Sequence, residues 1–162
     1  MGTRSGIGIE NPNTGVIKAI YCHWDGYLEH NGMILATHYN SSPKVNNLIA
    51  LGDLSSLRKN IGVKHAFSTY NLTEDEQKVY ELEHGNSCTF YGRDRGETGT
   101  EYKRFESRKD FVNGIDGEYF YLFVYDEDLN SGKWFYKKYN ETAWKNLEKA
   151  VDKLLDTMGV VE

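Results

Sequence analysis

A five-residue run near the amino terminus combines side chains that can bind ligands and move protons. His23, Trp24, Asp25, Gly26 and Tyr27 follow one another directly. Side chains two apart at a strand end point the same way, so His23 and Asp25 could pair as a general base and its orienting carboxylate. The flat faces of Trp24 and Tyr27 could hold a nucleobase or a sugar. The alternative is a structural corner in which His23 caps a turn and Trp24 is buried, and the sequence leaves both interpretations open.

A second run, residues 91–97, places two arginines between glycines. We interpret residues 92–96 as a loop in which Arg93 and Arg95 present forked donors to a phosphate or carboxylate while backbone amides approach closely. The same residues could form an exposed loop whose charges pair with one another, an arrangement that contributes little stability. The run is not a Walker loop, because the GxxxxGK[ST] pattern is absent.

Arg4 lies in the opening segment between Thr3 and Ser5, whose small side chains would leave its guanidinium reachable. A salt bridge to Asp25 would explain this arginine equally well. We predict one ligand pocket at which residues 23–27 and residues 93–95 meet. The candidate ligand-binding residues are Arg4, His23, Trp24, Asp25, Tyr27, Arg93 and Arg95.

The sequence contains no established catalytic or metal-binding motif. The four other histidines lack a spacing such as HExxH, and His30 and His38 are about two helical turns apart, which indicates one helix face rather than a ligand pair. Cys22 and Cys88 stand far apart in apolar surroundings, as expected of buried free thiols rather than a disulfide or a zinc site. We therefore assign no catalytic residue, no metal and no cofactor, and we favour a protein that is not an enzyme.

The charge balance narrows the classes of partner. The chain has 19 basic and 24 acidic residues, a net charge of −5. A sequence-independent nucleic-acid binder neutralises many phosphates and is usually basic, so nucleic acid is not the expected partner. No apolar run approaches the length of a membrane span and no signal peptide opens the chain, so we predict a cytoplasmic protein that does not use a membrane.

Length and patterning predict a single α+β domain over residues 1–162. We expect an antiparallel sheet with an N-terminal hairpin, short helices, and an amphipathic C-terminal helix packed on the sheet. A chain of 162 residues can bury a core without disulfides or metals. The aromatic fraction of 14%, with 12 tyrosines, suits either half-buried sheets or a surface that stacks flat ligands.

The amino-terminal part of the chain predicts a hairpin followed by short helices. Residues 3–9 alternate with a strand period, residues 16–22 are mostly apolar and β-branched, and turn-forming residues 11–15 join them. Ser42 before Pro43 is a favourable helix start. Three helical segments are expected next, namely one from about Leu28 or Gly32 to Tyr39, one from Ser42 to Gly52, and a short turn over 53–57.

The carboxyl-terminal part predicts a central strand and two longer helices. Residues 118–125 are continuously aromatic and aliphatic, as in a strand covered on both faces. Thr73 with Glu76 fits a capping box and predicts a helix over 74–83. Strands are also expected over 87–91, 102–105 and 133–137, the last at an edge of the sheet. A turn through Phe111 capped by Ser107 and a turn over 126–132 are expected as well. The final helix is expected to begin at Asn140, to carry Trp144 and Leu147 on an apolar stripe that continues to Met158, and to end at Gly159.

Three segments together resemble a family of small bacteriophage and prophage proteins. They are MGTRS at the start, IYCHWDGYLEHNG, and FYGRDRGE. Members of that family typically begin with Met-Gly-Thr-Arg-Ser and carry His-Trp-Asp-Gly-Tyr after the second strand. The resemblance covers about the first 60 residues and residues 90–97. It implies a phage origin and a role in the cytoplasm of the infected cell, and it brings no settled activity and no catalytic residues.

Three functional hypotheses follow. The first is a phage-encoded binding protein that counters host defence by sequestering a small anionic, nucleotide-like signal, for which stacking and bidentate arginine contacts would suffice. The second is an inhibitor that covers a host defence enzyme through exposed tyrosines and tryptophans. The third is a hydrolase of a phosphodiester or nucleotide, with His23 as base and Asp25 as its orienting group. The sequence leaves open whether the protein is a homo-oligomer.

Overall fold

The structure is a computed structural model that describes residues 2–126 and 131–157. Its strands are β1 (Ser5–Glu10), β2 (Ile17–Cys22), β3 (Leu54–Ser56), β4 (Thr89–Phe90), β5 (Lys103–Phe105), β6 (Tyr119–Tyr125), β7 (Gly132–Lys138) and β8 (Lys145–Asn146). Its helices are the π-helical turn η1 (Leu28–Gly32), α1 (Met33–His38), α2 (Ser42–Ala50), α3 (Glu74–His84), α4 (Tyr91–Arg95), α5 (Arg108–Gly114) and α6 (Leu147–Thr157).

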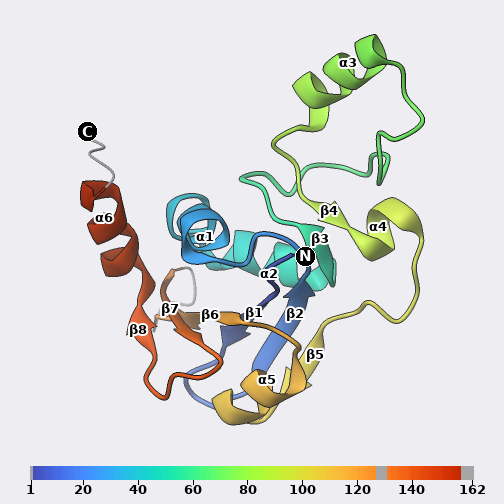
Figure 1. Ribbon diagram of the computed structural model, residues 1–162. Helices are drawn as coiled ribbons and strands as arrows, with labels where there is room; N and C mark the ends of the chain where they lie inside the picture. Colours follow the sequence, from blue (N-terminus) through green and yellow to red (C-terminus); the bar gives the residue numbers. More distant parts are fainter. Residues whose placement is uncertain (1, 127–130, 158–162) are drawn as a thin grey trace.

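The strands form one open, mostly antiparallel sheet (Figure 1). The strand order is β4-β3-β2-β1-β6-β7-β8, and β5 pairs with β2 as well. Two pairings are parallel, β1 with β6 and β2 with β3. This architecture confirms the predicted α+β class, with the N-terminal hairpin of β1 and β2 and with α6 packed beside β7.

Strand alternation divides the core between the two faces of the sheet. On one face Ile7 of β1, Ile20 of β2 and Phe123 of β6 belong to a buried cluster shared with α1, α2 and α6. On the other face Phe120 and Leu122 of β6 pack with Phe111 of α5, among others. Because neighbouring strand residues point to opposite faces, β6 is apolar at nearly every position and is buried from both sides, as its sequence predicts.

Glycines in β1 make room for an aromatic ring of α5. A Cβ atom at Gly6 would lie 3.0 Å from ring atoms of both Phe111 and Phe120, and one at Gly8 would lie 3.3 Å from Phe111. The glycines that weaken the strand pattern in the sequence therefore allow close approach of α5 to the sheet.

Capping residues in the sequence correctly predicted where several helices begin. The capping box of Thr73 and Glu76 forms at the start of α3, and the side chain of Ser107 accepts a hydrogen bond from Asp110 N at the start of α5. Helix α2 begins at Ser42, and its N-cap is Ser41, which places Ser42 inside the helix rather than at the cap position before Pro43. These elements form where the sequence carries its own capping group.

Two short elements differ from the sequence prediction. Residues 53–57 contain strand β3 rather than a helical turn, because buried Leu54 pairs with Cys22 on one side and Phe90 on the other. Residues 92–96 lie in and just after helix α4 rather than in a loop. Gly96 ends that helix in the left-handed conformation with φ +71°, a usual role for glycine at a helix end.

The C-terminal helix begins later than Asn140. Residues 145–146 pair with β7, so β7 is not an edge strand, and the Asn146 side chain accepts a hydrogen bond from Lys149 N at the start of α6. Trp144 is therefore not on the helix stripe; its ring stacks on Phe111 across the opposite face of the sheet. The predicted positions of Met158 and Gly159 lie outside the described residues, as does most of the predicted turn over 126–132.

An arm formed by residues 59–87 extends from the rest of the molecule and carries α3 (Figure 1). No residue of α3 is buried. Among the helices that the structure describes, none has the length and apolar character needed to cross a membrane.

Both thiols are buried and free, as the sequence predicts. Burial raises the pKa of Cys22 to about 12 and also raises the pKa of Cys88. We expect neither thiol to react with Ellman's reagent in the native protein at pH about 8, because the thiolate is the reactive form. The absorbance assay repeated in guanidinium should release two equivalents, one for each cysteine. A rapidly reacting thiol in native protein would contradict this arrangement.

Candidate functional site

The predicted site segment 23–27 is a sharp bend after β2. His23 N and Trp24 N still pair with Leu54 O and Ser55 O, at 3.0 and 3.1 Å. Asp25 then adopts a left-handed backbone with φ 58°, and Gly26 packs so closely on Arg4 that a Cβ atom would lie 2.9 Å from its backbone. The Asp-Gly pair therefore turns the chain against the N-terminal segment.

One buried amide holds this bend in place. Asn31, which is fully buried in η1, donates to Ser5 Oγ at 3.2 Å and to Trp24 O at 3.3 Å. Its backbone N donates to Asp25 O at 3.2 Å, and its Oδ1 is 2.9 Å from His30 Nδ1. Few helical turns in proteins are π-helical, and those that are often lie at functional sites. Here the π-helical turn η1 brings His30 and Asn31 to the bend.

The acid–base pair proposed from the sequence does not form. His23 Nδ1 lies 2.7 Å from the hydroxyl of Tyr21, whereas Asp25 accepts a hydrogen bond from Tyr27 at 3.2 Å. Trp24 is 43% exposed rather than buried, and Tyr27 is 37% exposed. The bend therefore presents two aromatic rings for contact but does not assemble a base with an orienting carboxylate.

Arg4 pairs with Asp116 at 3.4 Å rather than with Asp25. Burial raises the pKa of the Tyr21 hydroxyl, and the Arg4 guanidinium partly offsets that rise. Since Tyr21 contacts His23, Arg4 and His23 belong to one neighbourhood on the side of the bend that faces the N-terminal segment.

The two arginines of residues 93–95 have intramolecular partners. Arg93 uses its Nε and both terminal nitrogens as donors, at 2.9 to 3.2 Å, to the Asp94 carboxylate and to three backbone oxygens. Those oxygens belong to Ile61, Gly62 and Cys88, so Arg93 ties α4 to the base of the arm. Arg95 donates from Nε and one terminal nitrogen to the same oxygen, Oε2, of Glu97 and lies over the ring of Phe67.

The structure does not confirm the predicted meeting of residues 23–27 and residues 93–95 at one pocket, as four surface hollows show. In the part of the chain that the structure describes, none of these hollows is lined by both segments. Asp25 instead lines a hollow between α1 and the base of the arm, which we call the Arg58 cleft. Its lining residues are Asp25, His30, Ile34, His38, Arg58, Lys59, Gly85 and Asn86.

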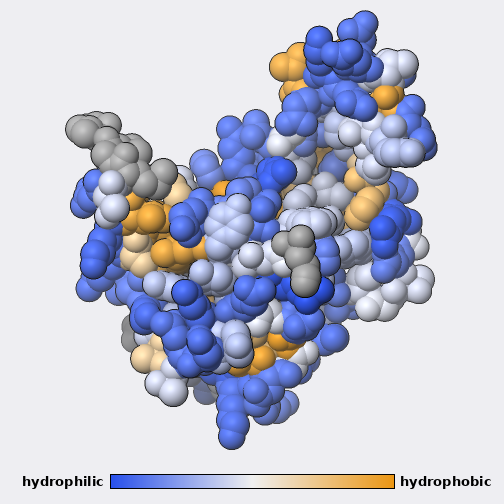
Figure 2. All heavy atoms as spheres, viewed as in Figure 1, coloured by the Kyte–Doolittle hydropathy of each residue, from blue (hydrophilic) through white to orange (hydrophobic). Residues whose placement is uncertain are grey.

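The Arg58 cleft has a volume of about 430 Å³ and a basic lining. It continues toward the underside of the arm, where Arg58 and Gly85 also line a second hollow. Hydrophilic side chains predominate on the face shown in Figure 2, which has a notch beside the arm. Asp25 is the one carboxylate among the lining residues of the cleft.

Hydrogen bonds hold the backbone of Arg58 in place, and its guanidinium lines the cleft. Tyr39 donates its hydroxyl proton to Arg58 O at 2.7 Å, and Arg58 N donates to Cys88 Sγ at 3.3 Å. The guanidinium donates to His30 Nε2 at 3.1 Å, so His30 carries its proton on Nδ1 and donates it to Asn31. Among the described residues neither Arg58 nor Lys59 forms an ion pair.

The positive charges around the cleft affect one another. Burial lowers the pKa of Lys44, whose ammonium donates to His38 O and Lys59 O at 2.7 Å each. The pKa of His38 is lowered by burial and further by Lys44 and Lys59. An anion in the cleft would relieve this repulsion between like charges.

Arg58 and Lys59 were not predicted from the sequence, and His30 and His38 were predicted only to share a helix face. The two histidines do follow one helical path, from η1 into α1, but they also line one hollow. The adjacent Arg-Lys pair at 58–59 was the available signal. Only the pairing of β3 beside β2 brings that pair next to residue 30.

Comparisons with known proteins leave the resemblance to phage proteins a prediction. No protein-family model, curated protein or solved structure matches this chain. Within residues 2–126 and 131–157, no three histidine, cysteine, aspartate or glutamate side chains gather as a metal site would require.

The contacts of Arg93 predict a structural role that can be measured. Asp94 is fully buried, so Arg93→Met removes its charged partner and should lower the free energy of unfolding by about 3 kcal/mol. The matched control is Arg95→Met, whose pair with Glu97 is half-exposed and should cost less than about 1 kcal/mol. Urea unfolding followed by circular dichroism compares the two variants. Equal losses in both would contradict the assignment.

Proposed function

We propose that this chain binds a small nucleotide-like anion in the Arg58 cleft without transforming it. The observation that carries the proposal is the lining of that cleft, where Arg58 and Lys59 lie with two imidazoles around a single carboxylate. Neither cation forms an ion pair within the described residues. A guanidinium that is held by His30 and has no carboxylate partner in this part of the chain, next to a second unpaired cation, favours an anionic ligand.

The groups beside the cleft suit a ligand that is charged at one end and flat at the other. Arg58 can bind a phosphate through its fork while Lys59 adds a point charge. The ring of Tyr27, which is 37% exposed, lies 6.3 Å from the ring of His30 and offers a stacking face near the cleft. The carboxylate of Asp25 can accept a hydrogen bond from an amino or hydroxyl group of the ligand.

Binding without turnover agrees with the separate partners of His23 and Asp25. In the hydrolase hypothesis Asp25 orients His23 as the base, whereas each of these side chains bonds to a tyrosine instead. The resemblance to phage proteins suggests the biological setting. In that setting the protein would sequester a nucleotide signal of host defence in the cytoplasm of the infected cell.

The affinity for nucleotides tests this proposal. Isothermal titration calorimetry with linear and cyclic mono- and dinucleotides should find at least one ligand, and Arg58→Gln should weaken its binding at least about tenfold, since a charge-assisted hydrogen bond is lost. Lys109→Gln removes an equal charge at an exposed position of α5 and is the matched control. No heat and no thermal shift with any nucleotide would rule the proposal out.

The arm favours inhibition of a host protein as a second candidate function. Tyr70 and Leu82 are each 88% exposed, and Val79 of α3 is also exposed. Figure 2 shows hydrophobic residues on the arm. Acidic residues alternate with these apolar ones along α3, so the complementary partner is a protein groove that is apolar at its centre and basic at its rim.

Capture from host lysate distinguishes the second candidate from the first. Tagged protein should retain a host protein in stoichiometric amount, and Leu82→Ser should lose it while remaining folded, because this side chain is exposed. Arg58→Gln is the control and should retain the same partner. A partner held equally well by Leu82→Ser, or an empty column, would count against docking on the arm.

A further inference from the structure

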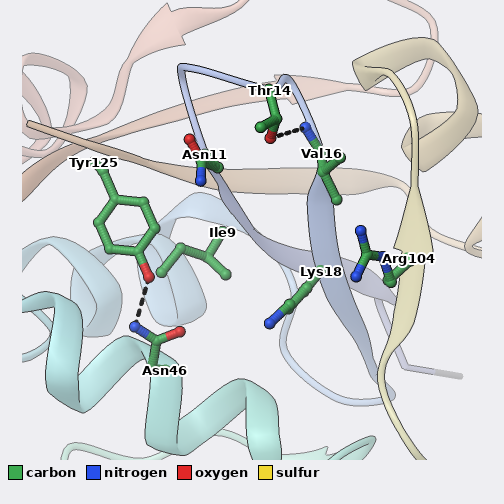
Figure 3. A pocket seen from close by; sticks show the side chains of 8 residues that line it. All are labelled: Ile9, Asn11, Thr14, Val16, Lys18, Asn46, Arg104 and Tyr125. Carbon is green, nitrogen blue, oxygen red and sulfur yellow. Dashed lines mark hydrogen bonds between the residues drawn. The ribbon is translucent and has the colours of Figure 1, made fainter. Parts of the chain in front are cut away.

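A separate hollow lies between the β1–β2 hairpin and α2 (Figure 3). Its volume is about 300 Å³, at the lower end of small-molecule sites. Its lining residues are Ile9, Asn11, Thr14, Val16, Lys18, Asn46, Arg104 and Tyr125. No residue of the Arg58 cleft contributes to it.

Two cations face this hollow from neighbouring strands. Lys18 of β2 and Arg104 of β5 are directly opposite each other in antiparallel pairing, and Figure 3 shows both side chains directed into the hollow. In the described ranges neither forms an ion pair, and no lining residue is acidic. The Lys18 ammonium lies 5.5 Å from the centroid of the Tyr102 ring, which is uncharged. Like charges at opposite positions destabilise a strand pair, so an anion between Lys18 and Arg104 would offset their repulsion.

Neutral donors complete the lining. Asn46 donates to the Tyr125 hydroxyl at 2.6 Å, which leaves the hydroxyl proton of Tyr125 for another acceptor. Thr14 Oγ1 accepts from Val16 N at 3.2 Å, so its own proton is also available to a ligand. Ile9 adds an apolar side chain, which suits a ligand with a short carbon skeleton.

We infer that this hollow binds the phosphate group of a small phosphate monoester. The forked guanidinium of Arg104 and the ammonium of Lys18 are the two kinds of cation that proteins use for phosphate, and the hydroxyls supply further donors to its oxygens. The volume admits a phosphate with a body of a few atoms. This site goes beyond the proposed function, because it shares no residue with the Arg58 cleft.

Titration with inorganic phosphate and glycerol 3-phosphate, followed by amide NMR at constant ionic strength, tests the inference. Saturable shifts are expected around residues 14–18, 46 and 104, with glycerol alone giving none. Arg104→Gln and Lys18→Met should each weaken the binding at least about tenfold. Lys103→Gln is the matched control, because the adjacent strand position points to the opposite face of the sheet.

Thermal unfolding separates loss of the site from loss of the fold. Without phosphate, Arg104→Gln should keep or raise the melting temperature, because it removes the repulsion with Lys18, and it should abolish the increase that phosphate gives the wild type. Arg58→Gln should leave these phosphate shifts unchanged, so failure of the nucleotide proposal is distinguishable. Shifts confined to the Arg58 cleft, equal weakening by Lys103→Gln, or no saturable binding would overturn the inference.

Discussion

The hydrogen bonds of the Asn31 side chain are the constraint on which the candidate site depends. This fully buried amide connects β1 through Ser5, the bend through Trp24 O, and the cleft through His30. A buried amide without partners is costly in a medium of low polarity, so each of these groups is held at a definite distance. The Asn31 side chain orients the His30 ring toward Arg58, and the backbone N–H of the same residue holds Asp25 O.

Buried tyrosine and tryptophan side chains also hold the site in place, because their hydroxyl and N–H groups donate hydrogen bonds to backbone oxygens. Tyr121 donates to Gly26 O at 2.6 Å, and Tyr39 donates to Arg58 O. Trp134 in turn donates to Tyr39 O at 2.8 Å from a fully buried ring. Buried tyrosines therefore have a third role besides sheet packing and ligand stacking. Their rings fill the core, while their hydroxyls fix the backbone of the bend and of the cleft.

Local signals in the sequence predicted the elements that are stabilised locally. The capping box of α3 and the apolar strand β6 are each readable over fewer than about ten residues, and the hairpin is readable from the continuous segment 5–22. Strand β3 was missed because distant pairing partners decide its conformation, and β8 was missed because it has only two residues. The same limit applies to the site. The bend at 23–27 was found from composition, whereas the contact of Arg58 with His30 depends on the placement of β3.

The parallel pairing of β1 with β6 has a consequence for the order of folding. Residues 5–10 pair locally with β2 through the hairpin, but their other neighbour is residues 119–124. During synthesis the middle of the sheet therefore lacks its most apolar strand until residues 119–124 have been made. Pairing over such a separation slows folding, and the hairpin must persist with one unpaired edge in the meantime. Because glycine weakens strand pairing, Gly6 and Gly8 lower the tendency of this unpaired edge to pair with a strand of another chain.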